Sequence, residues 1–98
     1  MTRFLLLASA RRDLANIWRY TSARWSTEQA ERYTAGIVDA GRALGAGERK
    51  GRAIDHVRAG YFKFPVGSHI IYYRMRDDDT CVVARILHER MDAPARLG

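Results

Sequence analysis

The sequence predicts an α+β fold with an N-terminal strand, an antiparallel hairpin of two helices and a three-stranded antiparallel meander. Between residues 10 and 44, apolar side chains recur every three or four positions, which is the period of an amphipathic helix. Between residues 57 and 88, short runs rich in Ile, Tyr and Val are separated by Gly, Pro or Asp, which is typical of strands joined by tight turns. A chain of 98 residues, 47% of them hydrophobic, suits one domain spanning residues 1–98.

The first strand and the first helix are expected close to the N-terminus. Residues 4–7 form a continuous apolar run, which indicates a strand that is covered on both faces. Ser9 follows this run and is a candidate N-cap for the first helix. That helix carries one apolar stripe, which consists of Leu14, Ile17, Trp18, Thr21 and Trp25.

The second helix is predicted over residues 27–44. Ser26 and Gln29 have the spacing of a capping box, in which each residue satisfies a backbone N–H of the other. Only a few residues separate the two helices, so they should fold back on each other as an antiparallel hairpin. The sequence Gly-Ala-Gly at residues 45–47 ends the helix, because glycine tolerates a left-handed C-cap. The inner face is expected to consist of Ala30, Tyr33, Ile37, Gly41 and Leu44.

The second half of the chain predicts a meander after a polar, irregular segment at residues 48–55. Turns are predicted at residues 65–67 and 77–79, because Pro, Gly and Asp favour tight connections. The three strands are predicted at residues 57–64, 68–76 and 80–88.

The composition limits the classes of partner and compartment. The formal net charge is +6, and every basic residue except Lys50 and Lys63 is an arginine. Arginine pairs bidentately with carboxylate or phosphate, so an acidic partner is one interpretation and a solvated basic surface is the other. The single cysteine, Cys81, has no partner for an internal disulfide, which favours the reducing cytoplasm. No stretch approaches the roughly 20 apolar residues that span a bilayer, so we expect no membrane association.

Metal and cofactor chemistry is not expected. His56, His69, His88 and Cys81 lack the paired spacing of known zinc motifs, and Cys81 lies at the start of an apolar strand, where a thiol packs. The glycines form no phosphate-binding loop, and the sequence therefore predicts neither a metal nor a cofactor.

Two residues of the meander leave alternatives open. Arg85 interrupts an apolar strand, and an unpaired charge there would be costly. It either forms an ion pair, with Asp55, Asp92 or the chain terminus, or belongs to a basic sheet face that receives a polyanion or an acidic peptide. His88 is either a general acid or base for phosphodiester cleavage or a hydrogen-bonded surface residue.

Several ordered segments together resemble the ParE-type toxins of the RelE/ParE toxin–antitoxin superfamily. The resemblance to their helical hairpin lies in residues 10–20, ARRDLANIWRY, followed by Trp25 and the pair Gln29-Ala30. The strands contribute three further segments, which are VRAGY at residues 57–61, GSHIIYYR at 67–74 and VARILHERMD at 83–92. The resemblance implies a helical hairpin packed on a mostly antiparallel sheet that the first strand joins.

The same resemblance implies a function. ParE-type toxins inhibit DNA gyrase, and a cognate ParD-like antitoxin neutralises them with its C-terminal segment. Toxins of the RelE type instead cut messenger RNA in the ribosome, so a ribosome-dependent endoribonuclease is the alternative. No tyrosine follows Tyr73, and only residues 49–52 represent the lysine-rich loop of the nucleases, which favours gyrase inhibition without catalysis.

The resemblance also suggests site residues. An endoribonuclease would use Arg58, Arg85 and His88. The C-terminal tail is implicated in toxicity, and its candidates for binding the target are Met91, Asp92, Arg96 and Leu97. The antitoxin is expected to dock across the helical hairpin and against the sheet, and its candidate contacts are Leu14, Ile17, Trp18, Tyr33, Ile37, Arg58, Arg74 and Arg85. A complex of toxin and antitoxin chains is therefore expected.

Overall fold

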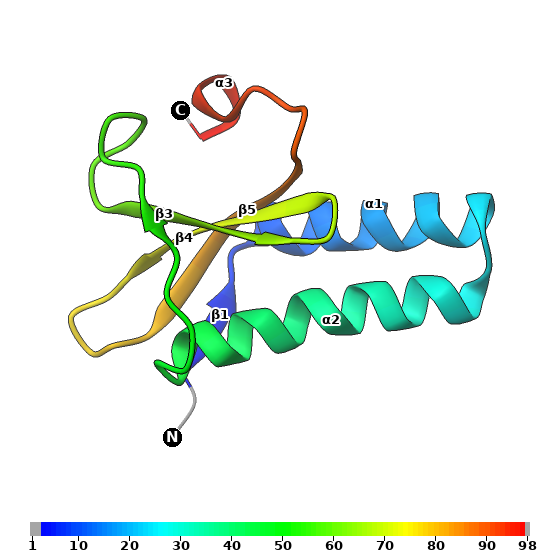
Figure 1. Cartoon of the computed structure of the whole chain (residues 1–98), viewed down its shortest axis with the longest axis horizontal. Coiled ribbons are helices and arrows are strands. Elements are labelled where there is room, and N and C mark those ends of the chain that lie inside the picture. The colour runs from blue at the N-terminus through cyan, green and yellow to red at the C-terminus, as the bar shows by residue number, and fades with distance from the viewer. Residues whose placement is uncertain (1–2, 98) are drawn as a thin grey trace.

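The computed structural model describes residues 3–97 and shows five strands and three helices in this part of the chain (Figure 1). The strands form one sheet in the order β1-β5-β4-β3-β2. In chain order the elements are β1 (Phe4–Leu6), α1 (Ala8–Arg24), α2 (Thr27–Gly45), β2 (Arg52–Ala53), β3 (Tyr61–Val66), β4 (His69–Met75), β5 (Cys81–His88) and α3 (Ala93–Leu97). The α+β class, the helical hairpin and the antiparallel meander are thus confirmed.

Strand β1 lies at the edge of the sheet, where it pairs with β5 in parallel. The register places Phe4 beside Cys81 and Leu6 beside Val83. All the other strand pairs are antiparallel. Because β1 covers only the first three residues of β5, the far half of that strand extends past it, and α1 runs alongside this half.

The helical hairpin agrees with the sequence prediction except at α1. Ser26 caps α2, since its Oγ accepts a hydrogen bond from the Gln29 N–H at 3.0 Å. Ser9 does not cap α1: it lies within the first turn, after the N-cap Leu7, and its hydroxyl donates to the Ala84 carbonyl at 2.7 Å. Trp25 does not belong to the buried stripe either. It follows the last residue of α1, where the two helices extend beyond the sheet, and is 63% exposed.

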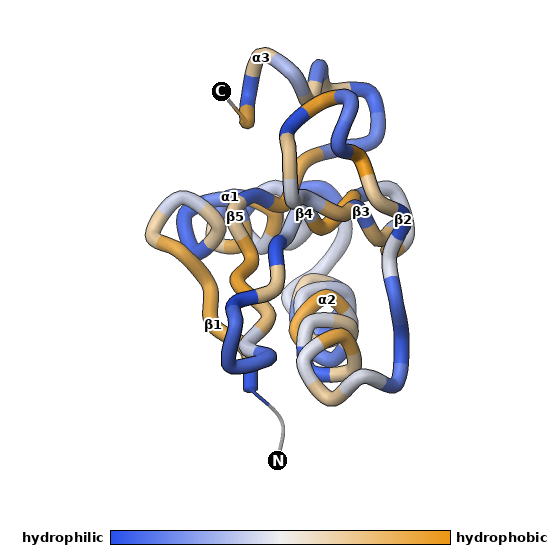
Figure 2. Tube along the Cα trace, turned by 90° about the vertical axis from the view of Figure 1, so that its left-hand side faces the viewer, coloured by the Kyte–Doolittle hydropathy of each residue, from blue (hydrophilic) through white to orange (hydrophobic). Residues whose placement is uncertain are grey.

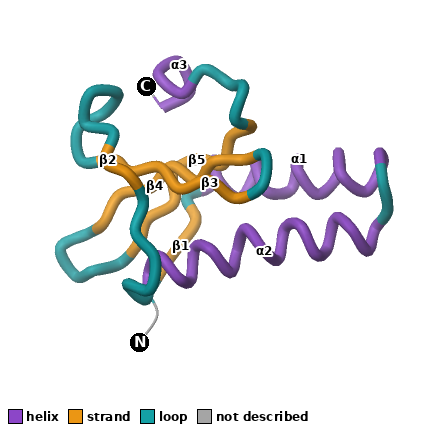
Figure 3. Tube along the Cα trace, viewed as in Figure 1, coloured by secondary structure: helices purple, strands orange, loops and turns teal. Residues whose placement is uncertain are grey.

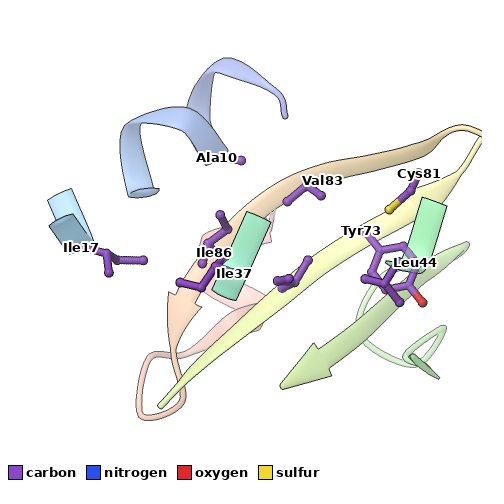
Figure 4. Close-up of a cluster of buried hydrophobic side chains, with 9 residues drawn as sticks. Ala10, Ile17, Ile37, Leu44, Tyr73, Cys81, Val83 and Ile86 are labelled. Atoms are coloured by element: carbon purple, nitrogen blue, oxygen red, sulfur yellow. The ribbon is translucent and has the colours of Figure 1, made fainter. Parts of the chain in front are cut away.

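The main core lies between the helices and one face of the sheet (Figure 4). Gly41 on the inner face of α2 faces β1 so closely that a Cβ there would lie 2.8 Å from the Phe4 ring. The absence of a side chain at this position allows α2 to pack against the edge strand. The buried residues of this cluster are Ala10, Ile17, Ile37, Leu44, Ile71, Tyr73, Cys81, Val83 and Ile86.

The region before the meander differs from the prediction in two ways. The segment predicted to be irregular contains the short strand β2, which pairs with β3, and the buried Ile54. Strand β3 begins at Tyr61, not at residue 57, because the N–H groups of Val57 and Arg58 both donate to the Ile54 carbonyl and close a turn. Gly60 continues this turn with φ +80, and the Asp55 side chain accepts its N–H.

The turn between β3 and β4 also lies later than predicted. Pro65 and Val66 still belong to β3, and the chain reverses at Gly67, whose φ is +58. A register shift between Tyr72 and Tyr73 interrupts the pairing of β4 with β5. This irregularity lies next to Arg85, which is the cross-strand partner of Tyr72.

The second face of the sheet is covered by α3, on the side opposite α2 (Figure 2). Tyr72 and Leu87 from the sheet pack there against Ile54 and Leu97. The tail therefore folds back onto the domain through a short helix that the sequence pattern did not indicate. No helix within the described residues 3–97 is long and apolar enough to cross a membrane.

Candidate functional site

A cavity of about 480 Å³ lies beside the free half of β5, between α1 and the tail. It combines residues that the sequence suggested for three different roles, namely antitoxin contact, target contact and RNA cleavage. These residues are Ile17, Arg85, His88, Met91 and Arg96. The sequence suggested none of the other polar residues that line this cavity, which are Asp13, Asn16, Tyr20 and His69.

Arg85 forms an ion pair with Asp13 of α1. Its Nε and Nη2 donate to the two carboxylate oxygens of Asp13 at 2.7 and 2.9 Å, and the two side chains are 24% and 13% exposed. This hydrogen-bonded pair raises the pKa of Arg85 above its ordinary value. Of the two interpretations that the sequence left open, the ion pair describes Arg85, but its partner is none of the suggested groups. Asp13 is the only acidic residue of α1, and this was the one feature of the sequence that could have identified it as the partner of Arg85.

The free half of β5 is closed by side chains of α1. Asp13 also accepts the backbone N–H of Ile86 at 3.0 Å, and Ser9 donates to the Ala84 carbonyl. The last hydrogen bond on the β1 side of β5 is donated by the Leu7 N–H to the Val83 carbonyl. The contacts of Ser9 and Asp13 continue along β5 directly after it. Backbone groups that an added strand would need are therefore already bonded.

His88 belongs to a polar cluster at the end of β5. It lies directly opposite His69 on β4, with ring centroids 5.3 Å apart, and its Nδ1 accepts the Arg90 N–H at 3.2 Å. The Nδ1 of His69 lies 2.6 Å from the Tyr33 hydroxyl oxygen. Burial lowers the pKa of His69, and the nearby His88 lowers it further, so His69 is neutral at neutral pH.

Arg58 does not lie with Arg85 and His88 at the cavity. It is placed by the turn before β3, stacks at 5.3 Å over the Tyr61 ring, and donates to the Leu97 carbonyl at 2.7 Å. Arg85 donates to the neighbouring Arg96 carbonyl at 3.2 Å. Both arginines thus hold the tail against the sheet, and only two of the three residues proposed for RNA cleavage line one cavity.

A groove of about 440 Å³ runs along the outer face of the helical hairpin. Leu14 and Trp18 line it, whereas Ile17 and Ile37 are 8% and 2% exposed and pack in the core, where Ile17 also borders the cavity beside β5. Tyr33 is half-buried on the sheet side of α2. Arg74 is exposed at the end of β4, away from the groove. The residues suggested for the antitoxin therefore fall on two separate surfaces and in the core.

The suggested target contacts are also divided. Met91, Asp92 and Arg96 are exposed, but Leu97 is buried in the second cluster.

Within residues 3–97, no group of three potential ligands could hold a metal ion. Cys81 is fully buried, and burial raises its pKa to about 11, which leaves the thiol protonated at neutral pH.

The model of the family described as the ParE toxin of the type II toxin–antitoxin system parDE matches residues 4–93. The chain belongs to the ParE toxin family. Toxin ParE1 of Mycobacterium tuberculosis is 41% identical over 96 residues, which cover 98% of both chains. Toxin ParE1 of Caulobacter vibrioides is 33% identical over 98 residues, covering 100% of both chains. Toxin ParE of Escherichia coli is likewise 33% identical over 98 residues, covering 100% of this chain and 95% of the relative.

Two solved structures share the fold of this ParE family member. The chromosomal ParDE TA system of P. aeruginosa superimposes with a TM-score of 0.76 at 18% identity, covering 90% of this chain and 96% of the other. The toxin–antitoxin complex RelBE2 of M. tuberculosis gives a TM-score of 0.67 at 26% identity, covering 89% and 96%. The resemblance read from the sequence is confirmed: this is a ParE-type toxin of a type II toxin–antitoxin system.

Proposed function

We propose that this ParE family member blocks replication in the cytoplasm by binding DNA gyrase, and that a ParD-like antitoxin neutralises it. The engagement of Arg58 and Arg85 is the observation that favours binding over catalysis. Both guanidinium groups donate to tail carbonyls, and Arg85 also donates twice to Asp13, so Arg85 has fewer donors left to stabilise a phosphorane and Arg58 is turned toward the tail.

The groove on the helical hairpin supports the antitoxin part of the proposal. Its apolar lining includes Leu14, Trp18 and Val38, and its charged lining residues are Glu31, Asp39 and Arg42, of which Arg42 is paired with Asp39. An amphipathic helix fits this groove because its apolar face fills it, while acidic residues outside the contact are attracted by the net charge of +6 on the whole chain. Arg58, Arg74 and Arg85 lie on the other side of the sheet, where a longer antitoxin segment would have to reach them.

A pair of tryptophan variants tests the antitoxin groove. Trp18→Ala should weaken antitoxin binding by at least tenfold, because it removes a large apolar anchor from the lining. Trp25→Ala is the matched control, since Trp25 is exposed outside the groove and should leave the affinity unchanged. Titration calorimetry measures both affinities, and equal effects of the two variants would contradict the groove.

The target surface is proposed on the exposed part of the tail beside the cavity. Met91 and Arg96 line the cavity, Asp92 follows Met91 in the chain, and the side chains of all three make no hydrogen bond within the described residues. Arg96→Ala keeps the backbone carbonyl that Arg85 binds, so the fold should survive while gyrase inhibition declines.

Two assays on the purified toxin separate gyrase inhibition from RNA cleavage. Supercoiling by gyrase should stop at toxin concentrations that leave ribosomal translation of messenger RNA intact. His88→Ala should retain most of the toxicity, because gyrase binding requires no proton transfer. If His88→Ala instead loses toxicity by about 10²-fold or more with normal folding, the ribonuclease becomes the better function.

A further inference from the structure

Cations gather at one end of the sheet, distant from the cavity and from the hairpin groove. Arg52 on β2 lies directly opposite Lys63 on β3, and Arg74 on β4 lies opposite Tyr61, two residues along β3. Side chains alternate between the two faces along a strand, so Lys63 and Tyr61 lie on the same face of β3. Arg52 and Arg74 lie on this face too, because each is the direct cross-strand partner of one of these two residues. We call Arg49, Lys50, Arg52, Lys63 and Arg74 the basic corner; the first two lie in the hydrophilic segment that leads to β2 (Figure 2).

No ion pair among residues 3–97 neutralises a cation of the basic corner, although Asp77 and Asp78 line a pocket beside Arg74. The ion pairs of residues 3–97 join Arg42 to Asp39, Arg76 to Asp78 and Arg85 to Asp13, and none includes a corner cation. Four of the five side chains are exposed and Lys63 is half-buried. Like charges directly opposite each other destabilise a sheet, so the pair of Arg52 and Lys63 costs folding free energy that a bound anion would recover.

The segment that carries these cations is fixed in place. The Gly51 N–H donates to the Tyr73 hydroxyl at 2.7 Å, and a Cβ on Gly51 would lie 2.5 Å from the Lys63 carbonyl oxygen. Gly51 and Arg52 are therefore held against β3, which lies beside β2 (Figure 3). Because the backbone of this segment is already ordered, binding an anion there costs only the ordering of the basic side chains.

The neighbouring side chains indicate which polyanion fits. Unpaired nucleotides need open aromatic rings for stacking, but Arg58 covers the Tyr61 ring and Tyr72 is 5% exposed. An acidic peptide needs apolar anchors, but the aliphatic side chains of this face, such as Leu87, are buried against α3. A protein can bind the backbone phosphates of a duplex through basic side chains alone, and such binding has no sequence preference.

We propose that the basic corner binds the phosphate backbone of double-stranded DNA. This binding is separate from the proposed inhibition of gyrase, because it needs only the toxin and the duplex. Contact with three or four phosphates gives a logarithmic salt dependence with a slope of about −3 to −4. The affinity is expected in the micromolar range at low salt, as for other non-specific DNA binding of about 10⁻⁴–10⁻⁶ M.

Fluorescence anisotropy with a labelled 20-base-pair DNA duplex tests the proposal on the toxin freed from its antitoxin. In the variant Arg52→Glu/Arg74→Glu the affinity should fall at least tenfold and the salt slope should become shallower. The fold should survive, since Glu at position 52 would pair with Lys63 across the strands. The matched control is Arg12→Glu/Arg32→Glu, which makes the same charge change at exposed helix positions and should weaken binding less than threefold.

Other outcomes would overturn the proposal. Equal losses in the two double variants would mean that overall charge, not the corner, binds DNA, and absence of binding at 50 mM salt would remove the site. Tighter binding of single-stranded RNA or of an acidic peptide, lost in the corner variant alone, would assign the corner to that ligand instead. None of these results depends on gyrase, so the proposal fails or stands independently of the supercoiling assay.

Discussion

Asp13 connects three parts of the fold through one carboxylate. It binds Arg85 with both oxygens and also accepts the Ile86 N–H, and Arg85 in turn holds the tail by the Arg96 carbonyl. The pair is largely shielded from water, in contrast to the exposed pair of Asp39 and Arg42 on α2. Loss of one buried partner leaves the other charge uncompensated, which costs much more than loss of a surface pair.

Replacement of Asp13 by Asn tests this difference. The variant keeps the side-chain volume but removes the charge, and the free energy of unfolding should fall by about 2 kcal/mol. Asp39→Asn should change it little, because that pair is exposed on both sides. Urea denaturation measures both values, and similar effects of the two variants would contradict a special role for Asp13.

His69 predicts a pH dependence of stability. Its pKa is lowered by burial and then by His88, while Glu89 raises it, and the Tyr33 hydroxyl faces its Nδ1. Because the unfolded chain has the ordinary histidine pKa of about 6.5, it binds more protons than the folded chain just below that pH. The contribution of His69 is therefore fully present above about pH 6.5 and is lost as the pH falls through the lower folded pKa.

Unfolding free energies measured between pH 7.5 and 5.5 should show this loss in the wild-type protein. His69→Gln should flatten the decline, because the titrating group is removed. His56→Gln is the control, since His56 is exposed in the turn before β3 and should leave the slope unchanged. A slope that is the same in wild type and His69→Gln would assign the pH dependence to other groups.

At the scale of elements, α2 depends on glycine where it approaches the N-terminal strand. A Cβ on Gly45 would lie 2.5 Å from the Arg3 carbonyl oxygen, and backbone does not yield as a flexible side chain does. Gly36, in the middle of the same helix, has no atom within 4 Å of such a Cβ. The same substitution should therefore have opposite effects at the two positions.

Gly45→Ala should lower the free energy of unfolding by about 1–3 kcal/mol through the collision with Arg3. Gly36→Ala should raise it by about 0.5–1 kcal/mol, because alanine loses less backbone entropy in a helix. Thermal unfolding of the two variants provides the comparison. Stabilisation by both substitutions would show that α2 can move away from β1.

At the scale of the whole molecule, the sheet has a separate cluster on each face, and the tail completes the second one. The family resemblance favoured a tail that binds the target, but Leu97 is 9% exposed and packs with Ile54, Tyr72 and Leu87. The tail has both parts, because Met91 remains 43% exposed beside the cavity. Stability and target binding should therefore depend on different residues of one short segment.

Leu97→Ala should lower the free energy of unfolding by about 2 kcal/mol or more, as is usual for a buried leucine. Met91→Ala should change stability little, yet weaken the inhibition of supercoiling. Chemical denaturation and the gyrase assay, run on both variants, separate the two roles. A Leu97→Ala variant of unchanged stability would mean that α3 does not hold the second cluster together.

The sequence by itself determined the elements whose cause is local. The helical period and the Ser26 cap located α2 to within a residue, and apolar runs bounded by turn residues located β4 and β5 to within one residue at each end. The packing of Cys81 followed from the apolar residues around it. The family resemblance came from ordered segments along almost the whole chain, and the match over residues 4–93 confirmed it.

Only the tertiary structure decided which distant residues meet. Asp13 and Arg85 are 72 positions apart, and no spacing rule selects this partner over Asp55 or Asp92. The parallel pairing of β1 with β5 joins strands separated in the chain by both long helices and by β2, β3 and β4, and the turn before β3 depends on bonds to the Ile54 carbonyl. The exposure of Trp25 and the burial of Leu97 follow from where the sheet ends, because a side chain packs only if another element lies opposite it.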